Sequence, residues 1–287
     1  MYRAVSEKTP VISRFAPSPT GLLHMGHAYS AILAYRATTE YAGRFILRIE
    51  DIDTNRCKPE FIDAIYEDLT WLGLQWEQPV RLQSEHFTDY QAALDVLKEK
   101  KAVYPCFCTR SEIIAEIEKA QSAPHGPDGP LYPGTCKHLT QPERDVRIRS
   151  GEAHAWRLNL NTALSVIGPL PDWCDREKGP IKTTPSLLGD IVLARKDTPT
   201  SYHLSVVVDD AHQNINHIVR GNDLFHATHA HIVLQKLLGL PTPTYHHHSL
   251  LTDKNGERFA KRNRSATLKS LRETGMNAAD LIAQIGL

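Results

Sequence analysis

The chain has 287 residues, a length that suits one large α/β domain with an insertion better than one small domain. Its 33 basic and 33 acidic residues cancel, so a nucleic-acid partner would have to be held by local basic patches and not by an overall positive field. No apolar stretch approaches membrane-spanning length and the N-terminus lacks the apolar core of a signal peptide, which predicts a cytoplasmic protein without a membrane partner.

The beginning of the chain alternates between strand and helix patterns. Residues 11–15 predict a short strand, which must end at the Pro-Ser-Pro-Thr-Gly sequence of residues 17–21, because prolines and glycine favour a turn. A helical pattern follows over residues 23–41, and a second strand over residues 45–50. Together they form a βαβ unit, which predicts a parallel sheet with its ligand site at the carboxyl ends of the strands.

This alternation stops near residue 100 and resumes near residue 200. We expect helices at 59–72, 87–101, 110–121 and 223–239, a loop at 122–136, and strands at 202–210, 215–219 and 245–251. The simplest arrangement is one split nucleotide-binding domain. Its predicted parts are a first catalytic half (10–100), an insertion (101–195), a second catalytic half (196–265) and a C-terminal helical tail (266–287).

Two histidines begin the first predicted helix, in the sequence His24-Met25-Gly26-His27. Positions three apart share a helix face, so both imidazoles should lie together at a helix N-terminus, which favours anions. Gly26 leaves room for a ligand near the backbone. Four such residues alone occur by chance or as a metal pair, but after a strand and a Pro/Gly turn they predict contacts to a nucleotide triphosphate whose α-phosphate is attacked.

Three segments together carry a family resemblance: Arg14 to Gly21, His24 to His27, and Arg48-Ile49-Glu50-Asp51. They closely resemble the first half of the glutamyl- and glutaminyl-tRNA synthetases. The resemblance implies a Rossmann-type class I catalytic domain that makes an aminoacyl-adenylate from ATP, with Mg²⁺ expected. His24, Gly26 and His27 would then bind ATP, and the two histidines would be catalytic.

The second class I signature should follow the last core strand. Residues 261–265 lie there, in the position of the family's Lys-Met-Ser-Lys-Ser loop, which implies ATP-binding and catalytic roles for Lys261 and Arg264. Arg264 keeps the charge of the lysine that it replaces and can grip phosphate with two N–H groups, but it is not equivalent to a mobile ammonium group.

Free glutamate carries two carboxylates and one ammonium group, so a selective pocket needs at least two donors and one carboxylate. The resemblance implies Arg14 for the side-chain carboxylate, Glu50 for the α-ammonium group and Arg220 for the α-carboxylate. The rest of the implied glutamate site is Phe15, Ala16, Pro17, Ser18 and Tyr202. Alone, each arginine could equally be a surface ion-pair residue.

Three of the five cysteines cluster in sequence as Cys106, Cys108 and Cys136. Three thiolates and one further ligand predict a closed, structural zinc site, one per chain, whereas the alternative is three reduced thiols in a small core. His125 and His138 are chemically better fourth ligands than a tyrosine. The glutamyl-queuosine tRNA synthetases, however, are similar in having Cys-x-Cys followed by Tyr-x3-Cys, and this resemblance implies Tyr132.

A run of three histidines, residues 246–248, lies in a predicted strand. Alternate strand residues face opposite sides, so the three rings cannot converge on one metal ion. We interpret them as histidines on the faces of a strand, with a role near ATP as the alternative.

The queuosine-directed family supplies the functional expectation. It implies activation of L-glutamate without tRNA, and transfer of glutamate to queuosine at the wobble position of tRNA(Asp). Full-length glutamyl- and glutaminyl-tRNA synthetases continue into an anticodon-binding domain, which we do not expect here. The catalytic domain of a monomer would then bind the anticodon stem-loop, with residues 144–149 and 254–264 as basic segments for the RNA backbone.

Three alternatives stay open at this point. The chain could be a minimal glutamyl-tRNA synthetase that charges the tRNA 3′ end, or another nucleotidyltransferase with a small acceptor. It could also be a non-catalytic RNA-binding paralogue, which the altered loop at residues 261–265 favours.

Overall fold

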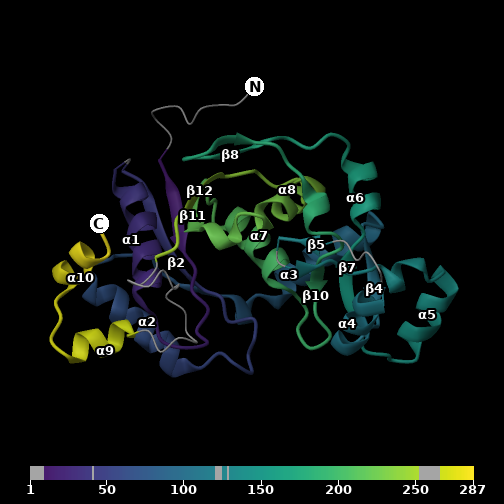
Figure 1. Ribbon diagram of the computed structural model, residues 1–287, viewed down its shortest axis with the longest axis horizontal. Coiled ribbons are helices and arrows are strands. Elements are labelled where there is room, and N and C mark those ends of the chain that lie inside the picture. Colours follow the sequence, from purple (N-terminus) through teal and green to yellow (C-terminus); the bar gives the residue numbers. More distant parts are fainter. Residues whose placement is uncertain (1–9, 41, 120–124, 128, 252–265) are drawn as a thin grey trace.

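The computed structural model describes residues 10–40, 42–119, 125–127, 129–251 and 266–287 (Figure 1). Its helices are α1 (Met25–Thr39), α2 (Pro59–Trp71), α3 (Phe87–Glu99), α4 (Arg110–Lys119), α5 (Gln141–Arg149), α6 (Leu160–Ile167), α7 (Tyr202–His212), α8 (Ala227–Leu238), α9 (Leu268–Glu273) and α10 (Ala278–Gln284). Within the described ranges, none of them has the length and apolar character needed to span a bilayer.

Among the described residues, the strands form four small sheets. They are β1 (Ile12–Phe15), β2 (Arg44–Ile49), β3 (Arg81–Leu82), β4 (Val103–Cys106), β5 (His125–Gly126), β6 (Gly129–Pro130), β7 (Ala155–Leu158), β8 (Trp173–Asp175), β9 (Gly179–Ile181), β10 (Val192–Ala194), β11 (His217–Gly221) and β12 (Thr244–His248). Short 3-10 helices are η1 (Gln83–Glu85), η2 (Thr135–His138), η3 (Pro185–Leu187) and η4 (Asn222–Leu224).

Strands β1, β2 and β3 pair in parallel, in the order β1-β2-β3, and α1 connects the first two. Strand β2 is buried on both faces, as strands of parallel sheets usually are. Its Phe45, Leu47 and Ile49 pack in the core that contains α1 and α2, whereas Ile46 packs with residues of α8 and β11. The predicted βαβ unit is therefore confirmed.

The second half of the chain continues this layer with parallel strands β11 and β12. Asn216, which precedes β11, joins β11 to β1 by two hydrogen bonds. The backbone N–H of Ile12 donates to Asn216 Oδ1 at 2.8 Å, and the backbone N–H of Asn216 donates to the Ile12 carbonyl at 3.1 Å. The carboxyl ends of β1, β2, β11 and β12 thus meet at one edge. Strands β8 and β9, which lie in the predicted insertion, extend the same sheet in the order β11-β12-β8-β9.

The strand predicted at 202–210 is wrong, because this segment forms helix α7. The consecutive Val206, Val207 and Val208 favour a strand by intrinsic preference, but tertiary packing overrides that preference. Val206 and Val207 are buried against α3 and α8, and the carboxylates of Asp209 and Asp210 at the end of the helix bond to buried arginines.

Residues 101–195 form most of the other end of the molecule, where β10, β7 and β4 make an antiparallel sheet with α4, α5 and α6 around it (Figure 1). At the opposite end, α9 and α10 pack against α1 and α2, with Leu268 and Leu281 fully buried. Arg272 of α9 bonds to Asp68 of α2 at 3.1 Å. The predicted helical tail at 266–287 is therefore helical.

Candidate active site

Helix α1 begins with an imidazole cap. His24 is the N-cap residue, and its Nδ1 accepts a hydrogen bond from the Gly26 amide at 3.1 Å. His27 Nδ1 accepts from the His24 amide at 3.2 Å, which completes a reciprocal capping box. Because each Nδ1 is an acceptor, a neutral ring carries its hydrogen on Nε2. The ring centroids lie 3.8 Å apart, so the predicted pairing of the two histidines at the helix N-terminus is confirmed.

Gly26 fits this cap for a steric reason. A Cβ atom at this position would lie 3.0 Å from His24 Cε1 and 3.1 Å from His24 Nδ1, which is closer than side chains normally approach. Any larger residue at position 26 would therefore displace the His24 ring.

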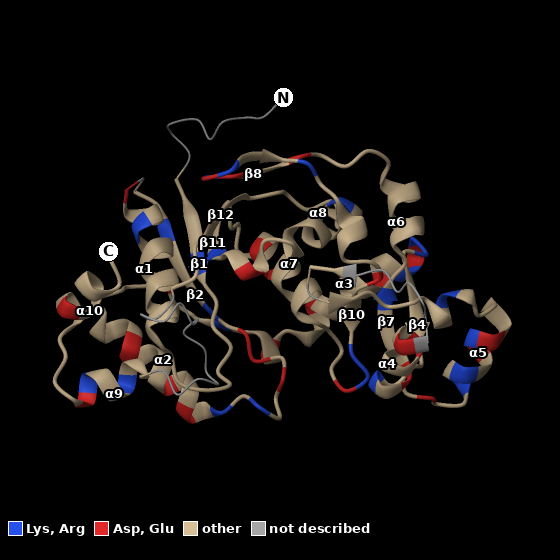
Figure 2. Ribbon diagram, viewed as in Figure 1, with Lys and Arg blue, Asp and Glu red and all other residues tan. Residues whose placement is uncertain are grey.

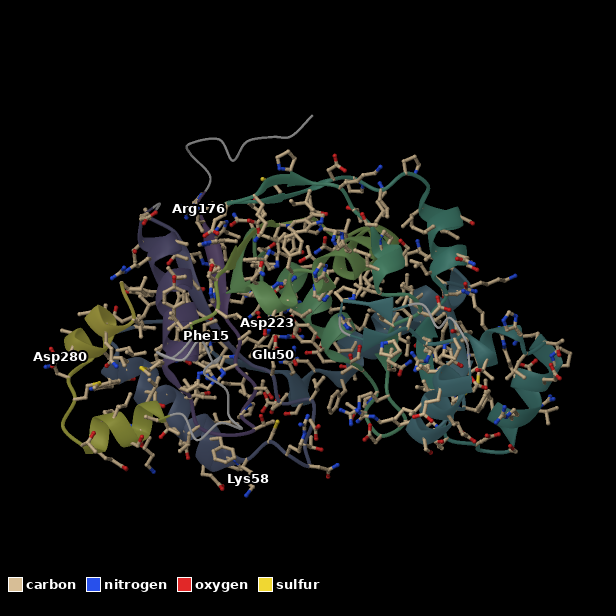
Figure 3. The ribbon with its side chains drawn as sticks, in the orientation of Figure 1. Phe15, Glu50, Lys58, Arg176, Asp223 and Asp280 are labelled. Carbon is tan, nitrogen blue, oxygen red and sulfur yellow. The ribbon has the colours of Figure 1, made fainter. Side chains whose placement is uncertain are left out.

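A cavity of about 500 Å³ opens beside the two histidines, at the carboxyl ends of the parallel strands. It brings together all predicted ATP- and glutamate-site residues of the described ranges, namely Arg14, Phe15, Ala16, Pro17, Ser18, His24, Gly26, His27, Glu50, Tyr202 and Arg220. Figure 3 shows Phe15, Glu50 and Asp223 close together near the centre of the molecule, although they come from β1, the end of β2 and η4. These residues stand up to about 200 positions apart in the chain, so the sheet edge alone assembles them.

Arg14 is almost fully buried and is held by helix α7. Its Nε donates to Asp210 Oδ1 at 2.9 Å, and Arg48 Nη1 donates to the same oxygen at 2.8 Å. Burial would raise the pKa of Asp210, but the charges of Arg14 and Arg48 outweigh burial and hold it below its usual value. Asp210 therefore stays ionised and orients the guanidinium group of Arg14.

Glu50 follows β2 and faces the same cavity. Its amide bonds to the Pro17 carbonyl at 3.0 Å, which ties it to the Pro/Gly turn, and its carboxylate accepts from Arg48 at 3.3 Å. Burial raises the pKa of the Glu50 carboxyl, and the charges of Arg48 and Arg14 oppose that rise. A ligand cation beside Glu50 would favour its ionised form.

Arg220 lies at the end of β11 with 5% of its surface exposed. Its Nη1 donates to the Tyr202 hydroxyl at 3.3 Å and its Nη2 donates to Thr228 Oγ1 at 2.6 Å. Tyr202 is the first residue of α7, so the helix that orients Arg14 also places the aromatic ring beside Arg220.

A second cavity of about 650 Å³ adjoins the first, and Ser18, Glu50 and Tyr202 line both. Its far wall comes from residues 129–132 and from β10, which belong to the predicted insertion. The two cavities are therefore continuous at these shared side chains. A ligand in the second cavity could contact a ligand in the first there.

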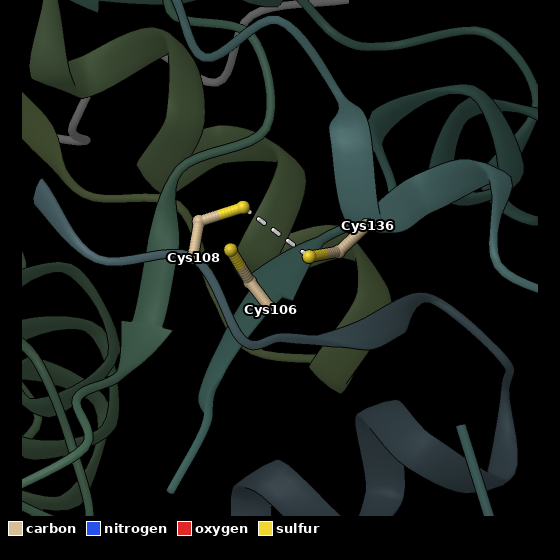
Figure 4. Close-up of side chains that lie close together, drawn as sticks. All are labelled: Cys106, Cys108 and Cys136. Carbon is tan, nitrogen blue, oxygen red and sulfur yellow. Dashed lines mark hydrogen bonds between the residues drawn. The ribbon is translucent and has the colours of Figure 1, made fainter. Parts of the chain in front are cut away.

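The three clustered cysteines converge on one point (Figure 4). Their sulfur atoms lie within 4.8 Å of one another, and the Tyr132 hydroxyl lies 3.4 Å from Cys106 Sγ and 3.5 Å from Cys108 Sγ. Cys136 also accepts a hydrogen bond from the Phe107 amide at 3.3 Å. This cluster could hold a metal ion. His138 is exposed and does not belong to it, and the side chain of His125 lies outside the described residues.

The histidines at 246–248 have separate partners, as the strand pattern predicts. His246 bonds to Glu177 at 2.8 Å, His247 to Asp175 at 2.8 Å, and His248 to Ser30 at 2.8 Å. His248 also lines the first cavity, which the alternative role near ATP allowed.

Two groups of predicted residues are not among those that line the cavity in the described part of the chain. Lys261 and Arg264, with the whole of the basic segment 254–264, lie outside the described residues. Helix α5 carries the other basic segment at the end of the molecule opposite α9 and α10 (Figure 2), and none of its residues lines either cavity. There Arg147 pairs with Glu152 and stacks over the Phe107 ring at 4.0 Å.

Sequence reasoning missed the residues that position the predicted ones. Asp210 orients Arg14 and Arg48 shares the same carboxylate oxygen, and neither was assigned a role, although Arg48 stands in one of the segments that carry the resemblance. Asp223 and Leu224 of η4 line the cavity as well, and only their proximity in sequence to Arg220 could have indicated them.

Comparisons with known proteins agree with this geometry. A family model described as tRNA synthetases class I (E and Q), catalytic domain, matches residues 10–287. A glutamyl-Q tRNA(Asp) synthetase of Rhodobacter capsulatus is 45% identical over 294 residues, which covers 96% of this chain and 100% of the relative. One of Symbiobacterium thermophilum is 38% identical, covering 95% and 84%.

Longer relatives match as well. A glutamate–tRNA ligase of Coprothermobacter proteolyticus is 35% identical over 95% of this chain, which spans 57% of that relative. The solved structure of a glutamate tRNA ligase from Elizabethkingia meningosepticum, at 24% identity, shares the fold with a TM-score of 0.78 over 97% of this chain and 61% of that one. The chain therefore belongs to the class I glutamyl- and glutaminyl-tRNA synthetase family, and within it to the glutamyl-Q tRNA(Asp) synthetases.

Proposed function

We propose that the protein activates L-glutamate with ATP, without tRNA, and transfers the glutamate to queuosine at the wobble position of tRNA(Asp). The observation that carries the proposal is the cavity that joins the imidazole-capped helix start to Arg14, Glu50 and Arg220. The names of the most similar relatives supply the acceptor.

In the activation step, the α-carboxylate of glutamate attacks the α-phosphate of ATP and pyrophosphate leaves. Arg14 would bind the side-chain carboxylate, Arg220 the α-carboxylate and Glu50 the ammonium group, which fixes the attacking oxygen near the phosphate. The Nε2 hydrogens of His24 and His27 suit hydrogen bonds to the phosphate oxygens as their charge develops. Mg²⁺ would enter with ATP, and Lys261 and Arg264 would complete the nucleotide site.

In the transfer step, a hydroxyl of the queuosine cyclopentene diol attacks the activated carbonyl and AMP leaves. The second cavity is a suitable entrance for this nucleoside, because it meets the glutamate site at Ser18, Glu50 and Tyr202. The catalytic domain of a monomer would bind the anticodon stem-loop along the insertion.

We also propose that Cys106, Cys108, Cys136 and Tyr132 hold a structural zinc ion. Three clustered sulfur atoms with a hydroxyl beside them form a donor set that suits zinc. With four protein ligands the ion would have no position for a substrate, so its contribution would be to the stability of the insertion.

The decisive experiment separates the two acceptors of a tRNA. The protein is incubated with ATP, labelled glutamate and tRNA(Asp) that carries queuosine but lacks the 3′-terminal adenosine, and in parallel with intact tRNA(Asp) that has guanosine at the wobble position. The proposal expects labelling of the first tRNA only. Labelling of the second alone would show transfer to the tRNA 3′ end and contradict the proposal. Absence of glutamate-dependent exchange of pyrophosphate into ATP would indicate a non-catalytic paralogue.

A further inference from the structure

A chain of hydrogen bonds runs behind Arg220 across three neighbouring strands. Arg220 of β11 and His247 of β12 are register partners, and β8, which carries Asp175, lies next to β12. Arg220 Nε donates to His247 Nε2 at 3.0 Å, and His247 Nδ1 lies 2.8 Å from Asp175 Oδ2. The three groups therefore form a continuous Asp175–His247–Arg220 relay.

The direction of these bonds fixes the state of the His247 ring. A guanidinium group only donates, so His247 Nε2 must be the acceptor, and the ring hydrogen must lie on Nδ1, where it is donated to Asp175. Burial and the charge of Arg220 lower the pKa of His247 to about 3, in agreement with a neutral ring. Asp175 is itself fixed, because its Oδ1 accepts from the amides of Glu177 and Lys178 at 3.0 and 3.1 Å.

Packing alone does not explain this arrangement. The side chains of Asp175 and His247 are both fully buried, and a buried ionised carboxylate generally stabilises a fold no better than apolar side chains of the same volume. The relay nevertheless ends on a cation that lines the substrate cavity. The Nε bond to His247 and the Nη2 bond to Thr228 occupy one edge of the Arg220 guanidinium group and set its plane.

We propose that Asp175 and His247 are positioning residues, which hold the Arg220 guanidinium group in the orientation that binds the α-carboxylate of the amino-acid substrate. This inference rests on the proposed function, in which Arg220 binds that carboxylate. A guanidinium group fixed before the substrate arrives loses little conformational entropy on binding, and it holds the attacking carboxylate oxygen in one place.

Two substitutions of His247 test its two hydrogen bonds separately, the bond of Nε2 to Arg220 and the bond of Nδ1 to Asp175. In His247→Gln the side-chain amide reaches the place of Nε2 and can still accept from Arg220. In His247→Asn the shorter amide takes the place of Nδ1, so it keeps the bond to Asp175 and loses the bond to Arg220. His246→Asn is the matched control, because its ring bonds to Glu177.

The assay is glutamate-dependent exchange of pyrophosphate into ATP. Loss of a buried hydrogen bond to a charged group predicts that His247→Asn raises KM for glutamate about tenfold or more, with KM for ATP within about twofold of wild type. His247→Gln should recover most of the loss, and His246→Asn should match wild type. An unchanged glutamate KM in His247→Asn, or an equal rise in both KM values in both variants, would overturn the positioning role.

A second measurement does not depend on activity. NMR spectra of protein with ¹⁵N-labelled histidine distinguish the two ring tautomers, and the signal of His247 is the one that disappears in His247→Gln. The relay requires the Nδ1–H tautomer at pH 7, and an Nε2–H tautomer or a charged ring refutes it. Absence of exchange in the wild-type protein would refute the proposed function and the substrate role together. Exchange with an unchanged glutamate KM in His247→Asn refutes only the inference.

Discussion

Replacement of Arg14 by alanine should remove glutamate binding while leaving the fold and the nucleotide site in place. Arg14 has 4% of its surface exposed, and Asp210 holds its guanidinium group at the end of β1. Truncation of one partner of a buried charge pair costs about 2–5 kcal/mol of binding free energy, or roughly 30-fold to several thousand-fold in affinity. Arg14→Lys should fall between wild type and Arg14→Ala, because an ammonium group keeps the charge but cannot bind a carboxylate with two parallel bonds.

The cost to stability should be smaller than for most buried ion pairs. When Arg14 is removed, the Asp210 carboxylate keeps its bond to Arg48 at 2.8 Å, so no buried charge is left without a partner. We therefore expect Arg14→Ala to lower the free energy of unfolding by about 1–3 kcal/mol, a typical value for a single substitution. Arg44→Ala is the matched control, because Arg44 lies on the neighbouring strand β2 and pairs with Glu77 at the surface.

Exchange of labelled pyrophosphate into ATP, measured over a range of glutamate and ATP concentrations, tests this reasoning, with thermal unfolding of each variant alongside. Arg14→Ala should show a glutamate KM at least 30-fold above wild type and an ATP KM within about twofold. A folded Arg14→Ala variant with a glutamate KM within twofold of wild type would refute the pocket.

Three further predictions concern other parts of the site. Gly26→Ala should reduce the exchange rate severalfold at saturating glutamate, because the new methyl group shifts the His24 ring slightly; a rate equal to wild type would contradict the cap geometry. Metal analysis of native protein should find one zinc ion per chain, and Cys108→Ser should lower the midpoint of thermal unfolding with little change in exchange rate. Burial raises the pKa of Glu50, so glutamate affinity should fall as the pH drops through that raised pKa and Glu50 takes up a proton. Glutamate binding should then release this proton, and titration calorimetry at pH 5 to 8 would detect the release.

The local parts of the site could be predicted from the sequence, because a few adjacent residues determine them. A helix start at His24, the turn at residues 17–21 and the convergence of the cysteines depend on short spacings, and the structure contains each of them. The orientation of the arginines could not be predicted, because Arg14 depends on Asp210, 196 positions away. The error at α7 has the same cause: a run of valines indicates a strand until its contacts with α3 and α8 are known.

The pairing of opposite charges explains why the cavity should select glutamate over glutamine. In the proposed arrangement, Arg14 and Arg220 each face one of the two carboxylates of glutamate and Glu50 faces its ammonium group, so every charge of the ligand meets an opposite charge. Glutamine has no net charge and would leave the Arg14 guanidinium group without a carboxylate from the ligand. Asp210 cannot compensate fully, because its single charge is shared with Arg48. Selectivity should therefore depend on the sharing of Asp210 as well as on Arg14. A second carboxylate beside Arg14 would neutralise its guanidinium group before the substrate arrives. Arg14 would then distinguish the carboxylate of glutamate from the amide of glutamine less strongly.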